Sequence, residues 1–125
     1  MDDTKFQPLI RTIRRKYQRR YAEAAYFFVL SALDYSIFRL GKSMNEGDDQ
    51  HITGQHLLDG IQQYAQEEFG PMAPFTFRTW GVQQAQDFGE IVFQMCHEGL
   101  LNAQDSDSLR DFEHGFDFEV AFSLS

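Results

Sequence analysis

The stretch AEAAYFFVLSALDYSIFRLG, residues 22–41, decides the fold of this chain. Drawn as a helix, it carries apolar side chains nearly all round its circumference. One face carries Tyr21, Ala25, Phe28, Val29, Ala32, Leu33, Ser36 and Leu40, and the remaining faces carry Tyr26, Phe27, Leu30, Ile37 and Phe38. A helix that is apolar on every side is buried against several neighbours. The sequence therefore predicts a central helix over residues 22–40 that ends at Gly41 as its C-cap.

Helical periodicity on either side of this stretch predicts the helices that cover it. Upstream, a basic helix within residues 1–20 carries an apolar stripe made of Phe6, Leu9, Ile10, Ile13 and Tyr17. Downstream, after a polar loop, we expect Thr53 to cap a helix over residues 54–69. The core face of that helix carries Leu57, Leu58, Ile61, Tyr64 and Ala65.

Two further helices are predicted before residue 100. A short one, over residues 72–80, carries Met72, Phe75 and Trp80 and ends at Gly81. The next, over residues 87–98, begins with Asp87 as its N-cap and Glu90 as the partner in a capping box. Its core positions are Phe88, Ile91, Val92 and Met95.

The residues after Leu100 predict a short β-hairpin and a docked tail. A polar turn between residues 100–101 and 109–112 is typical of a hairpin. The tail carries Phe112, Phe116, Phe118 and Phe122. We expect it to pack on the core, because four exposed phenylalanines would reduce solubility. The chain is thus predicted to be one mainly α domain, residues 1–125, of about five helices around the central helix, in the order of a winged helix-turn-helix.

Composition places the chain among globular proteins. Its 125 residues are the size of one domain, and 42% of them are apolar against 24% charged. The thirteen phenylalanines indicate a bulky aromatic core, or such a core together with a partner surface. A single cysteine excludes an intrachain disulfide and fits a reducing compartment. The N-terminus has no signal-peptide pattern and no apolar run is long enough to span a bilayer, so we expect a cytoplasmic protein without a membrane partner.

Charge is distributed unevenly along the chain. Residues 1–20 hold seven Lys/Arg against two acids, whereas residues 43–125 hold two Arg against fifteen acids, within a net charge of −8. The basic side chains of the segment RTIRRKYQRR, residues 11–20, are Arg11, Arg14, Arg15, Lys16, Arg19 and Arg20. They form the candidate surface for an anionic partner. We favour pairing of these residues with acids of the same domain or of a second copy, because the rest of the chain is strongly acidic.

Residues 87–97 contain two patterns that resemble reaction chemistry. The only cysteine, Cys96, stands beside His97, but adjacent residues of a helix point about 100° apart and do not face each other. Acidic neighbours such as Glu98 do not activate a thiol, so Cys96 is interpreted as structural. The letters D-F-G lack the Gly-rich loop and the His-Arg-Asp motif of a kinase, which excludes that activity.

The other residue types that carry chemistry form no specific pattern. The histidines are scattered along the chain at His51, His56, His97 and His114. The closest acidic groups, Glu67-Glu68 and Asp105 with Asp107, fit a solvated face or a loop. Neither a nucleophile elbow nor a nucleotide-binding loop is present. We therefore predict no catalytic, cofactor-binding or metal-binding residue, and the chain is not expected to be an enzyme.

The winged-helix order bears on nucleic-acid binding. In that fold the third helix, here residues 87–98, would enter the major groove. It offers Asp87, Glu90 and Glu98 and neither Lys nor Arg, while the helix before it offers only Arg78. Acidic side chains repel phosphates, so DNA reading by this helix is disfavoured even if the fold is correct.

Several strings of the sequence stand out together. They include His51-Ile52-Thr53-Gly54-Gln55, Phe69-Gly70-Pro71-Met72-Ala73 and Asp87-Phe88-Gly89-Glu90-Ile91-Val92-Phe93. With the Phe-rich end, they resemble a family of small uncharacterised proteins known chiefly from planctomycetes and verrucomicrobia. The resemblance covers most of residues 22–122, which would be the family core, and departs at His56, where the family pattern places a glutamate. It implies a recurring domain and brings no activity, cofactor or catalytic residue.

These observations favour a non-enzymatic cytoplasmic protein-interaction domain, with self-association through opposed basic and acidic surfaces as one form of it. The alternative is a nucleic-acid-associated regulatory protein that uses the basic segment 11–20. Which protein would be the partner does not follow from the sequence.

Overall fold

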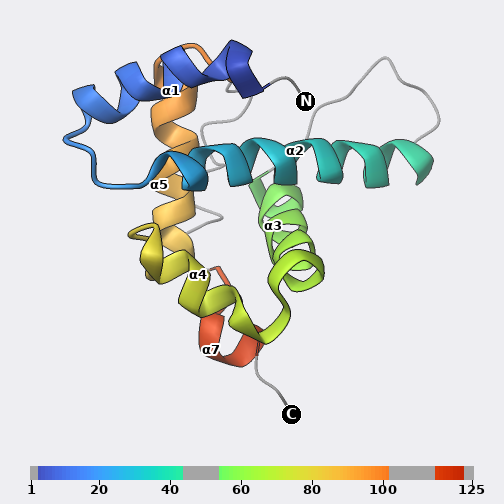
Figure 1. Cartoon of the computed structure of the whole chain (residues 1–125). Coiled ribbons are helices and arrows are strands. Elements are labelled where there is room, and N and C mark those ends of the chain that lie inside the picture. The colour runs from blue at the N-terminus through green and yellow to red at the C-terminus, as the bar shows by residue number, and fades with distance from the viewer. Residues whose placement is uncertain (1–2, 44–53, 102–114, 123–125) are drawn as a thin grey trace.

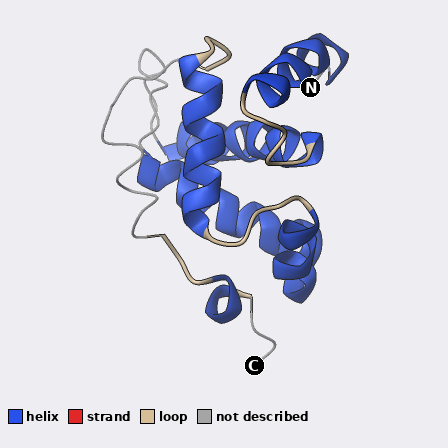
Figure 2. Ribbon diagram, turned by 90° about the vertical axis from the view of Figure 1, so that its left-hand side faces the viewer, coloured by secondary structure: helices blue, strands red, loops and turns tan. Residues whose placement is uncertain are grey.

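The computed structural model describes residues 3–43, 54–101 and 115–122. These residues are mainly helical, and no strand occurs among them. Their elements in chain order are α1 (Asp3–Lys16), α2 (Glu23–Ser43), α3 (Gly54–Phe69), the 3-10 turn η1 (Gly70–Met72), α4 (Ala73–Thr79), α5 (Ala85–His97) and α7 (Phe118–Ala121). Figure 1 shows α1 and α7 at opposite ends of the molecule, and the turned view of Figure 2 agrees.

Helix α2 packs against α1, α3 and α5 (Figure 1). Side chains from both of its predicted apolar faces are buried, including Ala25, Tyr26, Phe28 and Val29. The expectation that Gly41 ends this helix is wrong, because α2 continues to Ser43. A glycine inside a helix costs about 1 kcal/mol relative to alanine, which weakens a helix without having to end it.

Phe28 lies at the centre of the aromatic core. Its ring centroid lies 5.3–5.9 Å from the centroids of five other rings, and these belong to Tyr64, Phe69, Phe77, Trp80 and Phe88. Three of the partners come from α3 and α4, one from α5, and Trp80 directly follows α4. One side chain of α2 thereby joins the segments that follow it in the chain.

A close helix crossing fixes α2 against α3. Gly60 on α3 lies directly over the buried Ser36 of α2, so a Cβ atom added to Gly60 would overlap the Ser36 hydroxyl oxygen. That hydroxyl donates a hydrogen bond to the carbonyl oxygen of Ala32, 2.8 Å away, and needs no further partner. Only glycine at position 60 allows the two helices to approach this closely.

The C-terminal tail docks on the core, as the sequence predicts. The rings of Phe118 and Phe122 are buried, at centroid distances of 5.0 and 5.9 Å from Phe77. Asp117 caps α7, because its carboxylate accepts hydrogen bonds from the backbone N–H groups of Glu119 and Val120. Leu100 and Leu101, the start of the predicted hairpin, form no strand, while the rest of the hairpin and Phe112 lie outside the described residues. The winged-helix interpretation stays a prediction.

The chain reverses direction between α1 and α2 through two residues of left-handed backbone. Gln18 and Arg19 have φ angles of 65° and 53°, which end α1. The chain then passes beside the turn after α4, where the backbone N–H of Ala22 donates to the carbonyl oxygen of Trp80 at 3.0 Å. Gly81 sits in this contact with a φ of +89°, and a Cβ atom added to it would lie 2.7 Å from the carbonyl oxygen of Arg20.

We expect Gly81→Ala to destabilise the protein more than Gly99→Ala does. Both glycines have left-handed backbone, with φ angles of +89° and +85°, but nothing lies within 4 Å of a Cβ atom added to Gly99. The left-handed strain alone costs about 1–3 kcal/mol, and the clash with the Arg20 carbonyl oxygen adds to it only at Gly81. Urea unfolding measures both losses, and equal losses would contradict the close approach.

Candidate functional site

The basic segment is largely engaged within the domain itself. Arg11 pairs with Glu23, with its Nε atom 3.1 Å from a carboxylate oxygen. Arg14 is half-buried and donates from Nε to the carbonyl oxygen of Tyr21 at 2.7 Å. These contacts tie α1 to the start of α2 and to the turn between them. The structure thus joins two residues of the candidate anion surface to groups of the same chain.

Lys16 binds the far end of α5. Its Nζ atom lies 2.9 Å from a carboxylate oxygen of Glu98, which also accepts a hydrogen bond from the hydroxyl of Tyr17 at 3.0 Å. The hydrogen bonds from Lys16 and Tyr17 hold the pKa of Glu98 below its ordinary value. The same contact with Glu98 raises the pKa of Lys16. Residues more than eighty positions apart in the sequence are therefore joined by one carboxylate.

Asp87 connects the turn after α1 to the start of α5. Its buried carboxylate accepts hydrogen bonds from the hydroxyl of Tyr21 at 2.8 Å and from the backbone N–H groups of Gln83 and Gln84 at 2.8 and 3.2 Å. The guanidinium of Arg20 lies 3.6 Å away. Burial, followed by the hydrogen bond to Asp87, raises the pKa of Tyr21.

The prediction that Asp87 is the N-cap of this helix is wrong. The helix begins two residues earlier, at Ala85, and Gln84 is the N-cap. Asp87 stands at the third helical position, and its carboxylate reaches back to the N–H group of the cap residue. Position N3 is the usual place of the acidic partner in a capping box. The predicted three-residue spacing of the box is therefore right, but the box runs from Gln84 to Asp87 and not from Asp87 to Glu90.

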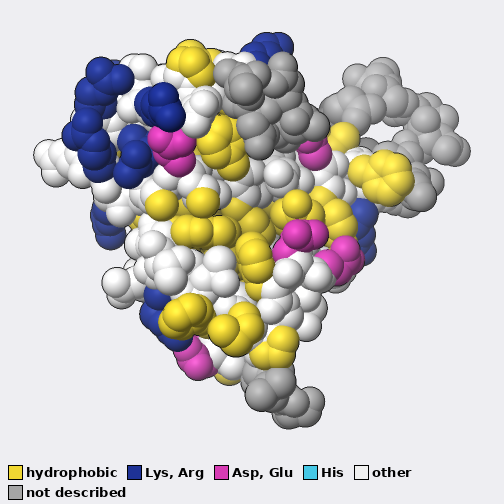
Figure 3. Space-filling view, viewed as in Figure 1, with side chains coloured by type: hydrophobic (Ala, Val, Ile, Leu, Met, Phe, Trp, Pro, Cys, Tyr) yellow, Lys and Arg dark blue, Asp and Glu magenta, His cyan; other side chains and the backbone are white. Residues whose placement is uncertain are grey.

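Arg15 and Arg19 are the two members of the basic segment that have no partner among the described residues. Both side chains are exposed. In Figure 3 the Lys and Arg side chains gather at the end of the molecule where α1 turns toward α2. Four of the six residues of the candidate anion surface therefore have a partner within the chain, and two have none among the described residues.

Cys96 and His97 lie in different surroundings. Cys96 is partly buried, and its burial raises the pKa of the thiol, which disfavours the reactive thiolate. His97 is exposed and stacks on Phe93, with ring centroids 5.6 Å apart and planes 17° apart. The expectation that the two side chains point to different places in the fold is confirmed, because Cys96 packs against the core and His97 lies at the surface.

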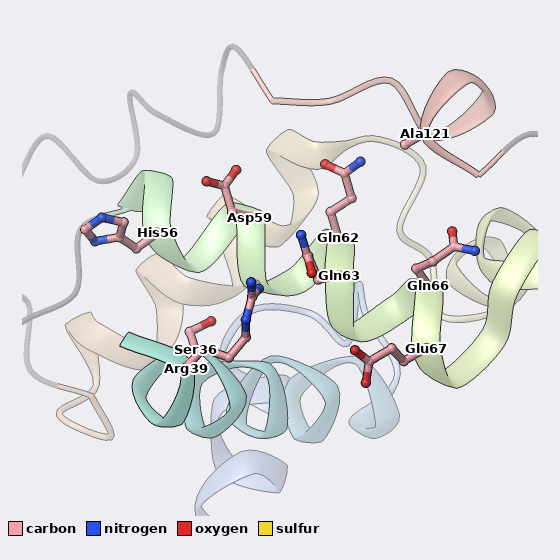
Figure 4. A pocket seen from close by; sticks show the side chains of 10 residues that line it. Ser36, Arg39, His56, Asp59, Gln62, Gln63, Gln66, Glu67 and Ala121 are labelled. Carbon is pink, nitrogen blue, oxygen red and sulfur yellow. The ribbon is translucent and has the colours of Figure 1, made fainter. Parts of the chain in front are cut away.

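A polar groove of about 760 Å³ runs between α2 and α3. Its charged side chains do not converge on one point: Arg39 reaches from α2 toward α3, while Asp59 and Gln62 point away from α2 (Figure 4). Glu67 accepts a hydrogen bond from the Tyr35 hydroxyl at 2.6 Å. Within the described part of the chain, no group of three or more His, Cys, Asp or Glu side chains is placed to hold a metal ion. His51 and His114 lie outside it.

An exposed apolar surface lies on α4 and on η1 and α7, each of which contacts α4. Met72 and Phe75 are each 57% exposed, and Val120 is 73% exposed. Arg78 and Glu119 flank these side chains and lie 3.4 Å apart. Figure 3 shows yellow side chains beside a blue and a magenta one over this end of the molecule. We call these five residues the α4/α7 face.

The sequence pattern over residues 72–80 left open which side of this helix is buried. The buried side of α4 carries Ala73 and Phe77, four residues apart, followed by the half-buried Trp80. Met72 and Phe75 lie on the opposite side. Side chains four residues apart share a helix face, so the pair Ala73 and Phe77 was the signal that could have found the buried side.

Neither family models, nor curated proteins, nor solved structures gave a match to this chain. The resemblance to the planctomycete and verrucomicrobial family therefore stays a prediction. In the residues that the structure describes, no helix combines the length and apolar character needed to cross a bilayer.

We expect Glu98→Gln to destabilise the protein at about pH 7 and to have a smaller effect at about pH 3. A carboxylate whose pKa is lowered by folding stabilises the fold above its unfolded-state pKa, and this contribution is lost as the pH falls through the folded-state value. Urea unfolding at both pH values measures the difference. Glu68→Gln, at an exposed position of α3, is the control. A loss that is equal at both pH values would contradict the role of the charge.

Proposed function

We propose that this chain is a non-enzymatic protein-interaction domain of the cytoplasm that associates with another folded polypeptide through its α4/α7 face. The observation that carries the proposal is the exposure of Met72, Phe75 and Val120 on elements that pack together, α4 with η1 and α4 with α7. Isolated exposed apolar residues are ordinary, but a group of large ones with a polar rim is typical of interaction sites.

The packing beneath the face supports this proposal. Phe77 of α4 and the tail residues Phe118 and Phe122 are buried and pack on one another in a close-packed interior. Phe75 and Val120 therefore stay in water unless another surface covers them. Covering an apolar side chain of this size contributes about 1.5–3 kcal/mol, which gives an incoming protein surface a direct gain.

The alternative, a nucleic-acid-associated regulator, has less support. Arg11, Arg14, Lys16 and Arg20 have partners within the domain. Nucleic-acid binding depends on the number of phosphates that a protein neutralises, and two unpaired arginines neutralise few. Retention of DNA or RNA at low salt that is lost in the Arg15→Ala, Arg19→Ala double variant would restore this alternative.

We expect a photo-crosslinking amino acid at position 75 to form a covalent protein adduct in cells. Phe75 is 57% exposed on the α4/α7 face, so its replacement lies against whatever protein covers that face. The same amino acid at position 93 is the matched control, because Phe93 is an exposed phenylalanine of α5 that stacks on His97. No adduct at position 75, or equal adducts at both positions, would overturn the proposed function.

A further inference from the structure

We propose that the surface beneath α7 is a peptide-binding site and that the C-terminal tail, residues 115–122, is a replaceable occupant of it. This surface, formed by Phe77, Arg78 and Phe88, is called the tail site. Its ligand class is a short peptide of another protein, with two phenylalanines four residues apart and an acid directly after the first. The inference goes beyond the proposed function, because it concerns what lies under α7 and not the exposed α4/α7 face.

Two buried phenylalanines anchor the tail. The ring centroid of Phe118 lies 5.0 Å from that of Phe77 on α4 and 6.1 Å from that of Phe88 on α5, so this ring contacts two helices. Phe122 follows one helical turn later, and its ring centroid lies 5.9 Å from that of Phe77. Short helices are commonly recognised through apolar anchors at positions i and i+4. A few buried aromatic anchors supply most of the binding energy in such contacts.

The polar groups of the tail are satisfied almost entirely within the tail itself. The carboxylate of Asp117 accepts hydrogen bonds from the backbone N–H groups of Glu119 and Val120. Toward the body, the guanidinium of Arg78 lies 3.4 Å from the carboxylate of Glu119. No other hydrogen bond or ion pair joins residues 115–122 to the rest of the described chain. The tail thus carries its own helix cap and offers the tail site aromatic rings and one negative charge.

The tail is built as a separable segment. Helix α7 has four residues, and a helix this short does not form in water without a surface to pack on. Figure 2 shows the tail as a segment that ends in one helical turn at the edge of the molecule. A hollow of about 390 Å³ is lined both by the tail residues Phe116 and Phe118 and by Ala85 and Gln86 at the start of α5.

This hollow means that the tail is not close-packed against the start of α5. Segments with few contacts to the body open locally while the rest of a domain stays folded. Opening of the tail exposes Phe77 and Phe88 together with Arg78. A peptide with the spacing and charge of Phe118, Glu119 and Phe122 then fits the tail site in place of the tail.

The test uses a fluorescein-labelled synthetic peptide of residues 115–122, GFDFEVAF, and measures its fluorescence anisotropy with the full chain. We expect a full-length Phe118→Ala, Phe122→Ala double variant to bind the peptide about tenfold more tightly than the wild type does. The reason is that the wild-type tail, tethered at an effective concentration on the order of millimolar, competes with the peptide.

The matched controls are variants of the peptide itself. A peptide with Phe118→Ala should bind the double variant about tenfold more weakly or less, because it lacks an anchor. A peptide with Val120→Ala should keep its affinity, because the Val120 side chain is exposed in the docked tail. No saturable binding by the folded double variant, or equal binding of the peptide with Phe118→Ala, would overturn the peptide site.

Hydrogen exchange of the wild type gives a second measurement that does not depend on folding of the double variant. The amides of Ala121 and Phe122 donate to the carbonyl oxygens of Asp117 and Phe118. They should exchange at least about tenfold faster than the amide of the buried Met95 on α5. Tail amides that exchange as slowly as that of Met95 would show that the tail leaves only when the domain unfolds, which contradicts a replaceable occupant.

Two further outcomes separate this inference from its neighbours. Dimerisation of the wild type that Phe118→Ala abolishes would identify the tail of a second copy as the occupant and overturn the partner peptide. Crosslinking at position 75 does not require the tail to open. No adduct there, with peptide binding intact, would therefore overturn the proposed function alone, and an adduct without peptide binding would overturn the peptide site alone.

Discussion

The packing of Phe28 against five aromatic rings is the interaction on which the rest of the structure depends. Aromatic rings at such distances stabilise each other beyond the area that they bury, and together they hold three segments in one orientation against α2. Phe77 extends the cluster to α7, because Phe118 and Phe122 pack on it. The polar contacts of Asp87 and Glu98 then attach α1 and its turn to the same body.

The same core determines which surface is left for association. Since Phe77 points into the cluster, the side of α4 that carries Met72 and Phe75 must face outward. The basic segment, in contrast, is engaged largely in holding α1 in place through Glu23 and Glu98. Part of the basic charge near the N-terminus is therefore paired within the domain, and the outward side of a short helix supports the proposed interaction.

Much of this fold could be predicted from the sequence, because the apolar residues of a long amphipathic helix recur with a recognisable helical period. The bounds of α3 and the core positions of α5 are confirmed, as is docking of Phe118 and Phe122. The errors fall where a local pattern fits two registers. The pattern around Asp87 fits this residue either as the N-cap or as the third helical residue, N3. The seven residues of α4 are too few for a helical period to show which side of the helix is buried. Pairing between distant residues, such as Lys16 with Glu98, leaves no local signal, so the sequence does not show which basic residues are paired within the chain.

The most direct test of the role of Phe28 uses the single tryptophan, Trp80, whose ring contacts Phe28, Phe69 and Phe77. Urea unfolding would be followed by Trp80 fluorescence and by helical circular dichroism in the wild type, in Phe28→Ala and in the exposed control Phe93→Ala. We predict that the two signals coincide in every protein and that Phe28→Ala alone loses about 3–5 kcal/mol of stability. Loss of the fluorescence transition in Phe28→Ala while the helical transition keeps its wild-type midpoint would show that the helices do not depend on this ring.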